Sequence, residues 1–223
     1  MCIRDRPEDD GHDLSGETDE HGGHERLSHE SRDHMSSTAL ARVNADGAKT
    51  APFIAEWIAR LAPPRGTSAS ALDVAMGSGR HTVALAIAGF RVFGVDARFD
   101  AVRDATLRVN LAGLRVHGWC ADLTQHPLPS SRFDVIVVTR YLQRNLFHAL
   151  RGAVRPGGVV LYETFTTAQR ALGTGPTSPD HLLEPGELLR AFDGFDVLSY
   201  EEVTAPEAVA RIAARRPLPR EPK

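Results

Sequence analysis

The sequence of 223 residues predicts an α/β protein built on a doubly wound sheet. From residue 49 onward, short apolar runs alternate with segments of helical periodicity, which is typical of βαβ units. The run 134–138 is β-branched and apolar on both faces, as in a central parallel strand. The last two runs follow one another across a short loop. We therefore expect a seven-stranded sheet that is mostly parallel, with an antiparallel C-terminal strand pair.

The first half of this domain alternates three expected helices with three expected strands. Apolar side chains between residues 53 and 61 recur at helical spacing, and Pro63-Pro64 ends that helix. Gly89 and Gly113 stop the next two helices. The expected helices span 51–61, 80–88 and 100–111, and the expected strands span 69–75, 91–95 and 115–120.

The second half holds the four remaining strands. Pro156-Gly157-Gly158 predicts a turn into the fifth strand, and Pro185 suits the early turn of a helix. The expected strands are 134–138, 159–162, 195–203 and 209–214, and the expected helices are 146–154 and 182–192.

Composition excludes several classes of protein. The formal net charge of −3 gives no basic excess that would indicate a nucleic-acid or membrane-surface protein. No apolar run approaches the roughly 18 residues of a membrane span. Cys2 and Cys120 are the two cysteines, too few for a disulfide framework, so we expect a reducing, cytoplasmic location.

Residues 1–48 differ from the rest of the chain and predict a disordered tail. They hold twelve Asp and Glu against five Arg and very few large apolar side chains. The remainder is therefore mildly basic, which suits an anionic substrate or a solvated surface. Five of the ten histidines also lie here, and a solvated tail is favoured over a metal tract because nothing enforces a coordination geometry. We expect no metal site.

The first six residues, Met1 to Arg6, resemble the translation of a transposon end used in sequencing-library preparation. We interpret them as an assembly artefact, with Met35 as a candidate start. The expected organisation is a tail over 1–48, a single domain over 49–216 and a C-terminal tail over 217–223.

A candidate nucleotide site follows the first three strands. Gly77-x-Gly79 opens a helix directly after the first strand, and glycine lets the backbone turn tightly beside a ligand. Asp96 and Asp122 follow the second and third strands, where carboxylates face the ligand crevice of a parallel sheet. Asp96 is placed to accept hydrogen bonds from ribose hydroxyls and Asp122 to approach an adenine amino group. The alternative for Asp96 is a turn-capping role.

The neighbours of the glycine turn discriminate between a dinucleotide and S-adenosylmethionine. The dinucleotide fingerprint has a third glycine where this chain has Thr82. Arg80 and His81 occupy the helix start that would cradle a pyrophosphate. Asp73 would repel a pyrophosphate but suits a ligand with an amino group, which S-adenosylmethionine has. A NAD(P)-dependent oxidoreductase is the alternative that these residues disfavour.

This order of motifs resembles that of the class I S-adenosylmethionine-dependent methyltransferases. Residues 79–86 are further similar to the small stand-alone methyltransferases grouped with tellurite-resistance proteins, and Ala75 stands where the family has its first glycine. The resemblance covers 50–216 and implies a Rossmann-like fold, S-adenosyl-L-methionine as cofactor and methyl transfer. The motifs that carry it are Asp73-x-Ala75-x-Gly77-x-Gly79, Gly94-Val95-Asp96, Ala121-Asp122, the run ending at Val138, and Arg155-Pro156-Gly157-Gly158.

The resemblance also implies which residues hold the cofactor. The glycine loop backs the methionine moiety with support from Asp73, while Asp96 holds the ribose. Thr139 lies closest to the departing methyl group. The adenine is flanked by residues that follow the second and third strands. The full implied set is Asp73, Ala75, Gly77, Ser78, Gly79, Asp96, Ala97, Arg98, Asp122, Leu123 and Thr139.

The acceptor side is less defined by the sequence. Arg140 and Tyr141 directly follow the fourth strand, where substrate is met in this fold, although packing and surface roles are the alternatives. Glu163 ends the fifth strand and could accept a substrate proton or pair with Arg140. These three residues are the candidate catalytic residues for a small-molecule acceptor.

Particular residues disfavour two other functions. Thr139-Arg140-Tyr141-Leu142 stands where base methylases carry an Asn-Pro-Pro-Tyr type signature, so we expect no nucleic-acid partner, and no membrane partner either. A methyltransferase-fold binding or partner protein without activity of its own is the alternative from another class. The intact Asp73, Gly77, Gly79, Asp96 and Asp122 disfavour it.

Overall fold

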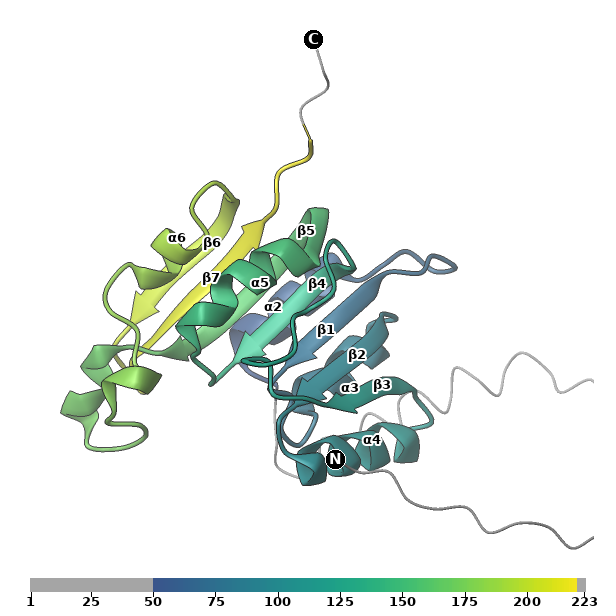
Figure 1. Ribbon diagram of the computed structural model, residues 1–223, viewed down its shortest axis with the longest axis horizontal. Coiled ribbons are helices and arrows are strands. Elements are labelled where there is room, and N and C mark those ends of the chain that lie inside the picture. Colours follow the sequence, from purple (N-terminus) through teal and green to yellow (C-terminus); the bar gives the residue numbers. More distant parts are fainter. Residues whose placement is uncertain (1–49, 220–223) are drawn as a thin grey trace, which may run out of the picture.

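Seven strands form one sheet in the order β3-β2-β1-β4-β5-β7-β6. The computed structural model describes residues 50–219, and Figure 1 shows this sheet. Strands β1 to β5 are parallel, whereas β7 runs antiparallel to both β5 and β6. The predicted mostly parallel sheet with an antiparallel C-terminal pair is therefore confirmed. The strands are β1 Ser70–Val74, β2 Arg91–Asp96, β3 Val116–Cys120, β4 Phe133–Thr139, β5 Val154–Phe165, β6 Asp196–Val203 and β7 Val209–Arg215.

Helices cover both faces of the sheet. In Figure 1, α5 and α6 lie in front of the strands and α2 lies behind them. Helix α4 packs against β3 and beside α3. The α-helices are α2 Pro52–Leu61, α3 Arg80–Ile87, α4 Phe99–Leu111, α5 Phe147–Ala153 and α6 Glu187–Ala191, and the 3-10 helices are η1 Arg144–Leu146, η2 Thr167–Leu172 and η3 Pro179–His181.

The two larger parts of the core lie on opposite faces of the sheet because alternate residues of each strand point to opposite faces, and a third, small cluster joins Met76 to Val102 and Ala105 of α4. On one face, Leu150 of α5 and Leu188 of α6 pack against the central strands. On the other face, Trp57 of α2 and Leu85 of α3 do so. In the run 134–138 that the sequence marks as most strand-like, Asp134 is partly exposed and Val135 is buried, while Ile136, Val137 and Val138 are fully inaccessible. This double burial explains the continuous apolar run.

Two expected boundaries were wrong. Pro156-Gly157-Gly158 lies inside β5 and not in a turn before it, because the strand pairs with β4 from Val154 onward. Between the pairs Phe133↔Val154 and Val135↔Val159, β5 advances five residues while β4 advances two, so the proline and glycines form an irregular, bulged segment.

The helix expected over 182–192 begins only at Glu187. Leu183 is instead extended and forms a parallel bridge with Thr166, which excludes it from a helix. Gly186 adopts a left-handed conformation with φ of 69° and precedes the first helical residue. Pro185 therefore lies before the helix and not in its early turn.

Most of the predictions for the two ends of the chain concern residues that the structure does not describe. The tail expected over 1–48, the six-residue artefact and Met35 lie outside the described residues, as do residues 220–223. Residues 217–219 follow β7 without regular secondary structure. Within residues 50–219, the helices are all too short, or not apolar enough, to cross a membrane.

Candidate functional site

The residues implied in cofactor binding meet at one edge of the sheet. Val74 of β1 pairs with Val95 of β2 and with Val138 of β4, so these strands end at the same level. Asp96 pairs in turn with Cys120 at the end of β3. The carboxyl ends of four parallel strands thus converge, as in the ligand crevices of open α/β sheets.

The loop from β1 to α3 is held in a tight turn. Ala75, Gly77 and Gly79 all have positive φ, at 53°, 51° and 80°. The Met76 N–H donates to the Val95 carbonyl over 3.0 Å, which ties the loop to β2. Ala75 stands where the family has a glycine and keeps the left-handed conformation despite its Cβ, at a cost of about 1 kcal/mol. Ser78 is exposed on the same loop.

Gly79 is also constrained by α4. A Cβ added at Gly79 would lie 2.7 Å from the Cβ of Ala105, closer than real Cβ contacts allow. We predict that Gly79→Ala lowers the free energy of unfolding by about 2–4 kcal/mol, combining left-handed strain with overpacking. Urea denaturation measures this change.

The matched control is Gly66→Ala. Gly66 has a similar φ of 82°, and no atom of residues 50–219 lies within 4 Å of its added Cβ. It should lose only about 1 kcal/mol. Equal losses for the two variants would contradict a role for the contact between the glycine loop and α4.

Asp96 connects the end of β2 to the glycine loop. Its Oδ2 accepts the Gly77 N–H over 3.0 Å, and its Oδ1 accepts the Arg98 N–H over 2.9 Å. Each carboxylate oxygen can accept a further hydrogen bond. The turn-capping role and a ligand-holding role are therefore compatible in this side chain.

Asp73 is buried beneath this loop with one oxygen unsatisfied. Thr82 Oγ1 donates to Asp73 Oδ2 over 2.6 Å. Asp73 Oδ1 has no hydrogen-bond partner among residues 50–219. Burial raises the pKa of Asp73 to about 7, although the hydrogen bonds from Thr82 oppose this shift. An unpartnered buried acceptor is costly and suits a site that receives a donor from a ligand.

His81 contacts Thr139, a pairing that the sequence did not reveal. His81 Nε2 accepts the Ala51 N–H over 3.3 Å, so the neutral ring carries its proton on Nδ1. Nδ1 lies 3.1 Å from Thr139 Oγ1 and donates to it, which leaves the Thr139 hydroxyl proton for another acceptor. Burial lowers the pKa of His81 to about 3, with smaller contributions from Arg80 and Arg140, so the ring stays neutral.

Arg140 follows β4 in a strained conformation. Its φ is 54°, and its N–H donates to the Glu163 carbonyl over 2.9 Å. The guanidinium lies 4.4 Å from the ring centroid of Phe165 and forms two hydrogen bonds with Glu207. Non-glycine residues with positive φ are uncommon, and they cluster at functional sites.

Glu163 is buried behind Arg140. Arg211 Nε donates to Glu163 Oε2 over 2.8 Å, and Arg140 Nε lies 3.9 Å from Glu163 Oε1. The strand register places Glu163 opposite Arg211, and Arg211 opposite Glu201, with which it also pairs. Of the two roles that the sequence allowed for Glu163, this packing favours the ion pair over proton transfer from a substrate.

Tyr141 lies toward the cofactor edge. Its hydroxyl donates to Gln143 Oε1, and its carbonyl accepts the Tyr162 hydroxyl over 2.8 Å. Burial raises the pKa of Tyr141, and the charges of Asp122 and Asp96 raise it further. The phenol is therefore neutral near physiological pH and is a hydrogen-bonding group, not a phenolate base.

The remaining predicted residues line the ends of β2 and β3. Asp122 is exposed, and its Oδ1 accepts the Thr124 N–H over 2.8 Å, which lowers the pKa of Asp122. This hydrogen bond gives Asp122 a turn-capping role. Leu123 is partly buried against the core, while Ala97 and Arg98 are exposed directly after β2.

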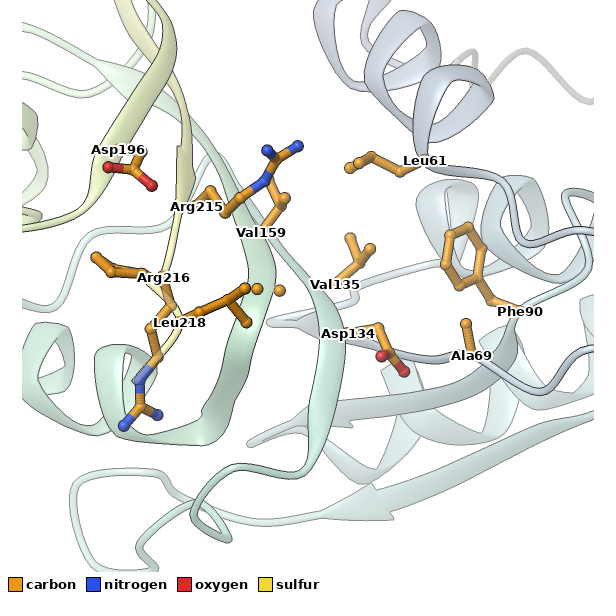
Figure 2. A pocket seen from close by; sticks show the side chains of 13 residues that line it. Leu61, Ala69, Phe90, Asp134, Val135, Val159, Asp196, Arg215, Arg216 and Leu218 are labelled. Atoms are coloured by element: carbon orange, nitrogen blue, oxygen red, sulfur yellow. The ribbon is translucent and has the colours of Figure 1, made fainter. Parts of the chain in front are cut away.

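A cavity of about 560 Å³ lies at the opposite edge of the sheet (Figure 2). Its lining includes Phe90, Val135 and Val159, near the amino ends of the parallel strands. Asp134 also lines it, but its carboxylate already accepts the Ser70 N–H over 2.6 Å and pairs with Arg155. The residues predicted for cofactor and acceptor lie at the other edge, so this cavity is separate from the candidate site.

Part of the chain is similar to a known protein family. Residues 71–158 match the family model described as a methyltransferase domain. A search of curated proteins gave no match.

Solved structures share the fold at low sequence identity. An S-adenosylmethionine-dependent methyltransferase from Mesorhizobium loti is 22% identical, with 77% of this chain and 99% of that chain covered and a TM-score of 0.57. The [4+2]-cyclase SpnF is 15% identical, with 85% and 95% covered and a TM-score of 0.62. TehB from Haemophilus influenzae is 16% identical, with a TM-score of 0.57; 68% of this chain is covered, and the chain spans 58% of TehB.

The family match covers the glycine loop, Asp96, Asp122 and Thr139, which the sheet brings to one edge. The overall fold is shared with these structural neighbours. Residues 71–158 thus match a methyltransferase domain, the chain has the fold of class I S-adenosylmethionine-dependent methyltransferases, and this match implies S-adenosylmethionine as cofactor.

Proposed function

We propose that this chain is an S-adenosylmethionine-dependent methyltransferase that methylates a small-molecule acceptor. The observation that carries the proposal is the buried, unpartnered Oδ1 of Asp73 beneath the glycine loop. This acceptor suits the ammonium group of the cofactor's methionine moiety, either directly or through a water molecule. A pyrophosphate at the same place would bring a second anion against a buried carboxylate.

The residues around Asp73 also fit the rest of the cofactor. Asp96 keeps acceptor capacity for ribose hydroxyls after its bonds to two backbone N–H groups. A Cβ added at Gly77 would meet no atom of residues 50–219 within 4 Å, so the loop borders open space. Ala97, Arg98 and Leu123 are the residues proposed to border the adenine, with Asp122 near its amino group.

The cofactor supplies a methyl group that its sulfonium has already activated for in-line displacement. The protein then has to orient the acceptor and exclude water. Thr139 lies at the tip of β4 with its hydroxyl oriented by His81, and we propose that it donates a hydrogen bond at the reacting centre. Tyr141 contributes a neutral phenol, and Arg140 a cation, on the acceptor side.

Glu163 is a poor candidate for a general base, which is one of the two roles that the sequence left open for it. It is 1% exposed and is held between two arginines, which block its approach to a substrate proton. We therefore propose that Glu163 positions Arg140. An acceptor whose proton leaves readily, or that carries none, fits this arrangement best.

The alternative is a methyltransferase-fold binding or partner protein without its own activity. The fold is shared with a cyclase, so fold alone does not select methyl transfer. The complete set of Asp73, Gly77, Gly79 and Asp96 with their observed geometry favours a working cofactor site. We also propose a cytoplasmic location, in keeping with the free thiol of Cys120.

Calorimetric titration tests the ligand class. We expect the full chain to bind one S-adenosylmethionine, and NAD to give no saturable heat under the same conditions. Saturable binding of NAD, or no binding of S-adenosylmethionine, would contradict the proposal.

Turnover separates an enzyme from a binding protein. Formation of S-adenosylhomocysteine with a panel of thiol, phenol, carboxylate and chalcogen acceptors is the expected result. Cofactor binding with no turnover of any acceptor in the panel would favour the partner-protein alternative.

A further inference from the structure

The two outer nitrogens of the Arg140 guanidinium, Nη1 and Nη2, form a positively charged fork next to the proposed methyl-transfer centre. Arg140 immediately follows Thr139, and the two outer nitrogens of its guanidinium both donate to the carboxylate of Glu207, with Nη1 2.7 Å from Oε1. Such two-point pairing is the geometry with which arginine recognises carboxylates. The Arg140 side chain is 29% exposed, so the fork is accessible from solvent.

The inner side of this guanidinium is fixed by the sheet. Phe165 lies under its plane at 4.4 Å, and the buried Glu163 lies 3.9 Å from Nε. Glu163 is itself held by Arg211 of β7. Because these groups occupy the inner edge and one face, the outer fork is the part of Arg140 that a ligand can reach.

Glu207 occupies the fork from a different element. It lies in the loop between β6 and β7, and its side chain is 47% exposed. The hydrogen bonds from Arg140 lower the pKa of Glu207, and Arg211 and Arg80 lower it further. Arg80 is the first residue of α3 after the glycine loop, so its charge acts on Glu207 from the end of the sheet where the cofactor residues lie.

We propose that Arg140 binds the carboxylate of the methyl acceptor and that Glu207 fills this place while no acceptor is bound. The inference rests on the proposed function and names its substrate class: small molecules that carry a carboxylate. Displacement of Glu207 leaves the three arginines Arg80, Arg140 and Arg211 with the two carboxylates of Glu163 and Glu201, an excess of positive charge that favours an anion. The carboxylate on Arg140 would anchor the acceptor one residue away from Thr139.

Benzoate and its uncharged counterpart benzamide test this proposal as probes. Both are titrated by calorimetry into the full chain saturated with S-adenosylhomocysteine. We expect the wild-type protein to bind benzoate more tightly than benzamide. Glu207→Gln removes the competing charge and should raise the benzoate affinity roughly five- to tenfold without changing that of benzamide. Arg140→Gln should abolish the preference for benzoate.

Glu201→Gln is the matched control. Glu201 is also 47% exposed and pairs with Arg211 on the same sheet, but it does not contact Arg140. It should leave the benzoate affinity unchanged. Equal affinities for benzoate and benzamide in the wild-type protein, or the same gain in both glutamate variants, would overturn the proposal. The wild-type comparison needs no variant and therefore stands even if Glu207→Gln fails to fold.

A parallel titration with S-adenosylmethionine keeps the two proposals apart. If the cofactor binds and benzoate shows no preference over benzamide, the carboxylate inference fails while the proposed function stands. If the cofactor does not bind, the proposed function itself fails.

Discussion

Replacing Asp96 with alanine should weaken S-adenosylmethionine binding by roughly a hundredfold, equivalent to about 3 kcal/mol. Asp96 accepts the N–H groups of Gly77 and Arg98, so its removal releases the glycine loop from the end of β2. It also removes the carboxylate proposed to hold the ribose, and hydrogen bonds to an ionised group contribute about 1.5–3 kcal/mol. Calorimetric titration of the cofactor measures the combined loss.

Asp100→Ala is the control for a general effect of charge. Asp100 is exposed in the first turn of α4, where it pairs with Arg103 over 3.5 Å. Its replacement should leave the cofactor affinity within about twofold of the wild-type value. An Asp96→Ala protein that folds and binds S-adenosylmethionine as tightly as the wild type would show that Asp96 only caps a turn.

The sheet could be predicted because its signals are local. The apolar run of β4 and the helical spacing of α2 are each written in a few consecutive residues, and right-handed βαβ connections constrain how such elements assemble. The errors arose where distant residues decided the outcome. Leu183 reads as helical by itself but pairs with Thr166, and the Pro156 segment becomes strand because β4 lies beside it.

The candidate site likewise has some features that could be predicted from the sequence and others that could not. The glycine loop and Asp96 were predictable because the loop follows β1 and Asp96 ends β2, and strand ends share one edge of a parallel sheet. The ion pair between Arg140 and Glu207 joins residues 67 positions apart, and no sequence pattern predicts it. Arg211 likewise meets Glu163 only through the antiparallel register of β5 and β7, which the sequence order of strands leaves open.

The binding of S-adenosylmethionine should also strengthen about tenfold between pH 6 and pH 8. Asp73 has a pKa of about 7 in the free protein because it is buried, so it is largely protonated at pH 6. The cofactor's ammonium group favours the ionised carboxylate, and binding at pH 6 must therefore release a proton. Calorimetry in buffers of different ionisation enthalpy measures that release. Asp73→Asn should bind more weakly at pH 8 and show no such pH dependence.

The stability of the free protein provides an independent test of the raised pKa of Asp73. Ionisation of Asp73 at higher pH should lower stability, whereas it should strengthen cofactor binding. The folded pKa of Asp73 lies above the unfolded value of about 4, so its contribution to stability is full below pH 4 and is lost as the pH rises to about 7. His81 has a lowered folded pKa of about 3, so its contribution is full above pH 6.5 and is lost as the pH falls toward 3. Between pH 7 and pH 4 the two effects oppose one another.

Asp73→Asn should therefore leave the destabilising effect of His81 at low pH without compensation. We expect the variant to lose about 2 kcal/mol of unfolding free energy relative to wild type when the pH falls from 8 to 5, because the compensating protonation of Asp73 is gone. Urea denaturation of both proteins at pH 8, 6.5 and 5 measures the difference, and groups other than Asp73 cancel in it. Parallel pH profiles would mean that Asp73 is already ionised in the free protein. An ionised Asp73 would also remove the reason for the cofactor to bind more tightly at pH 8, so the two experiments must succeed or fail together.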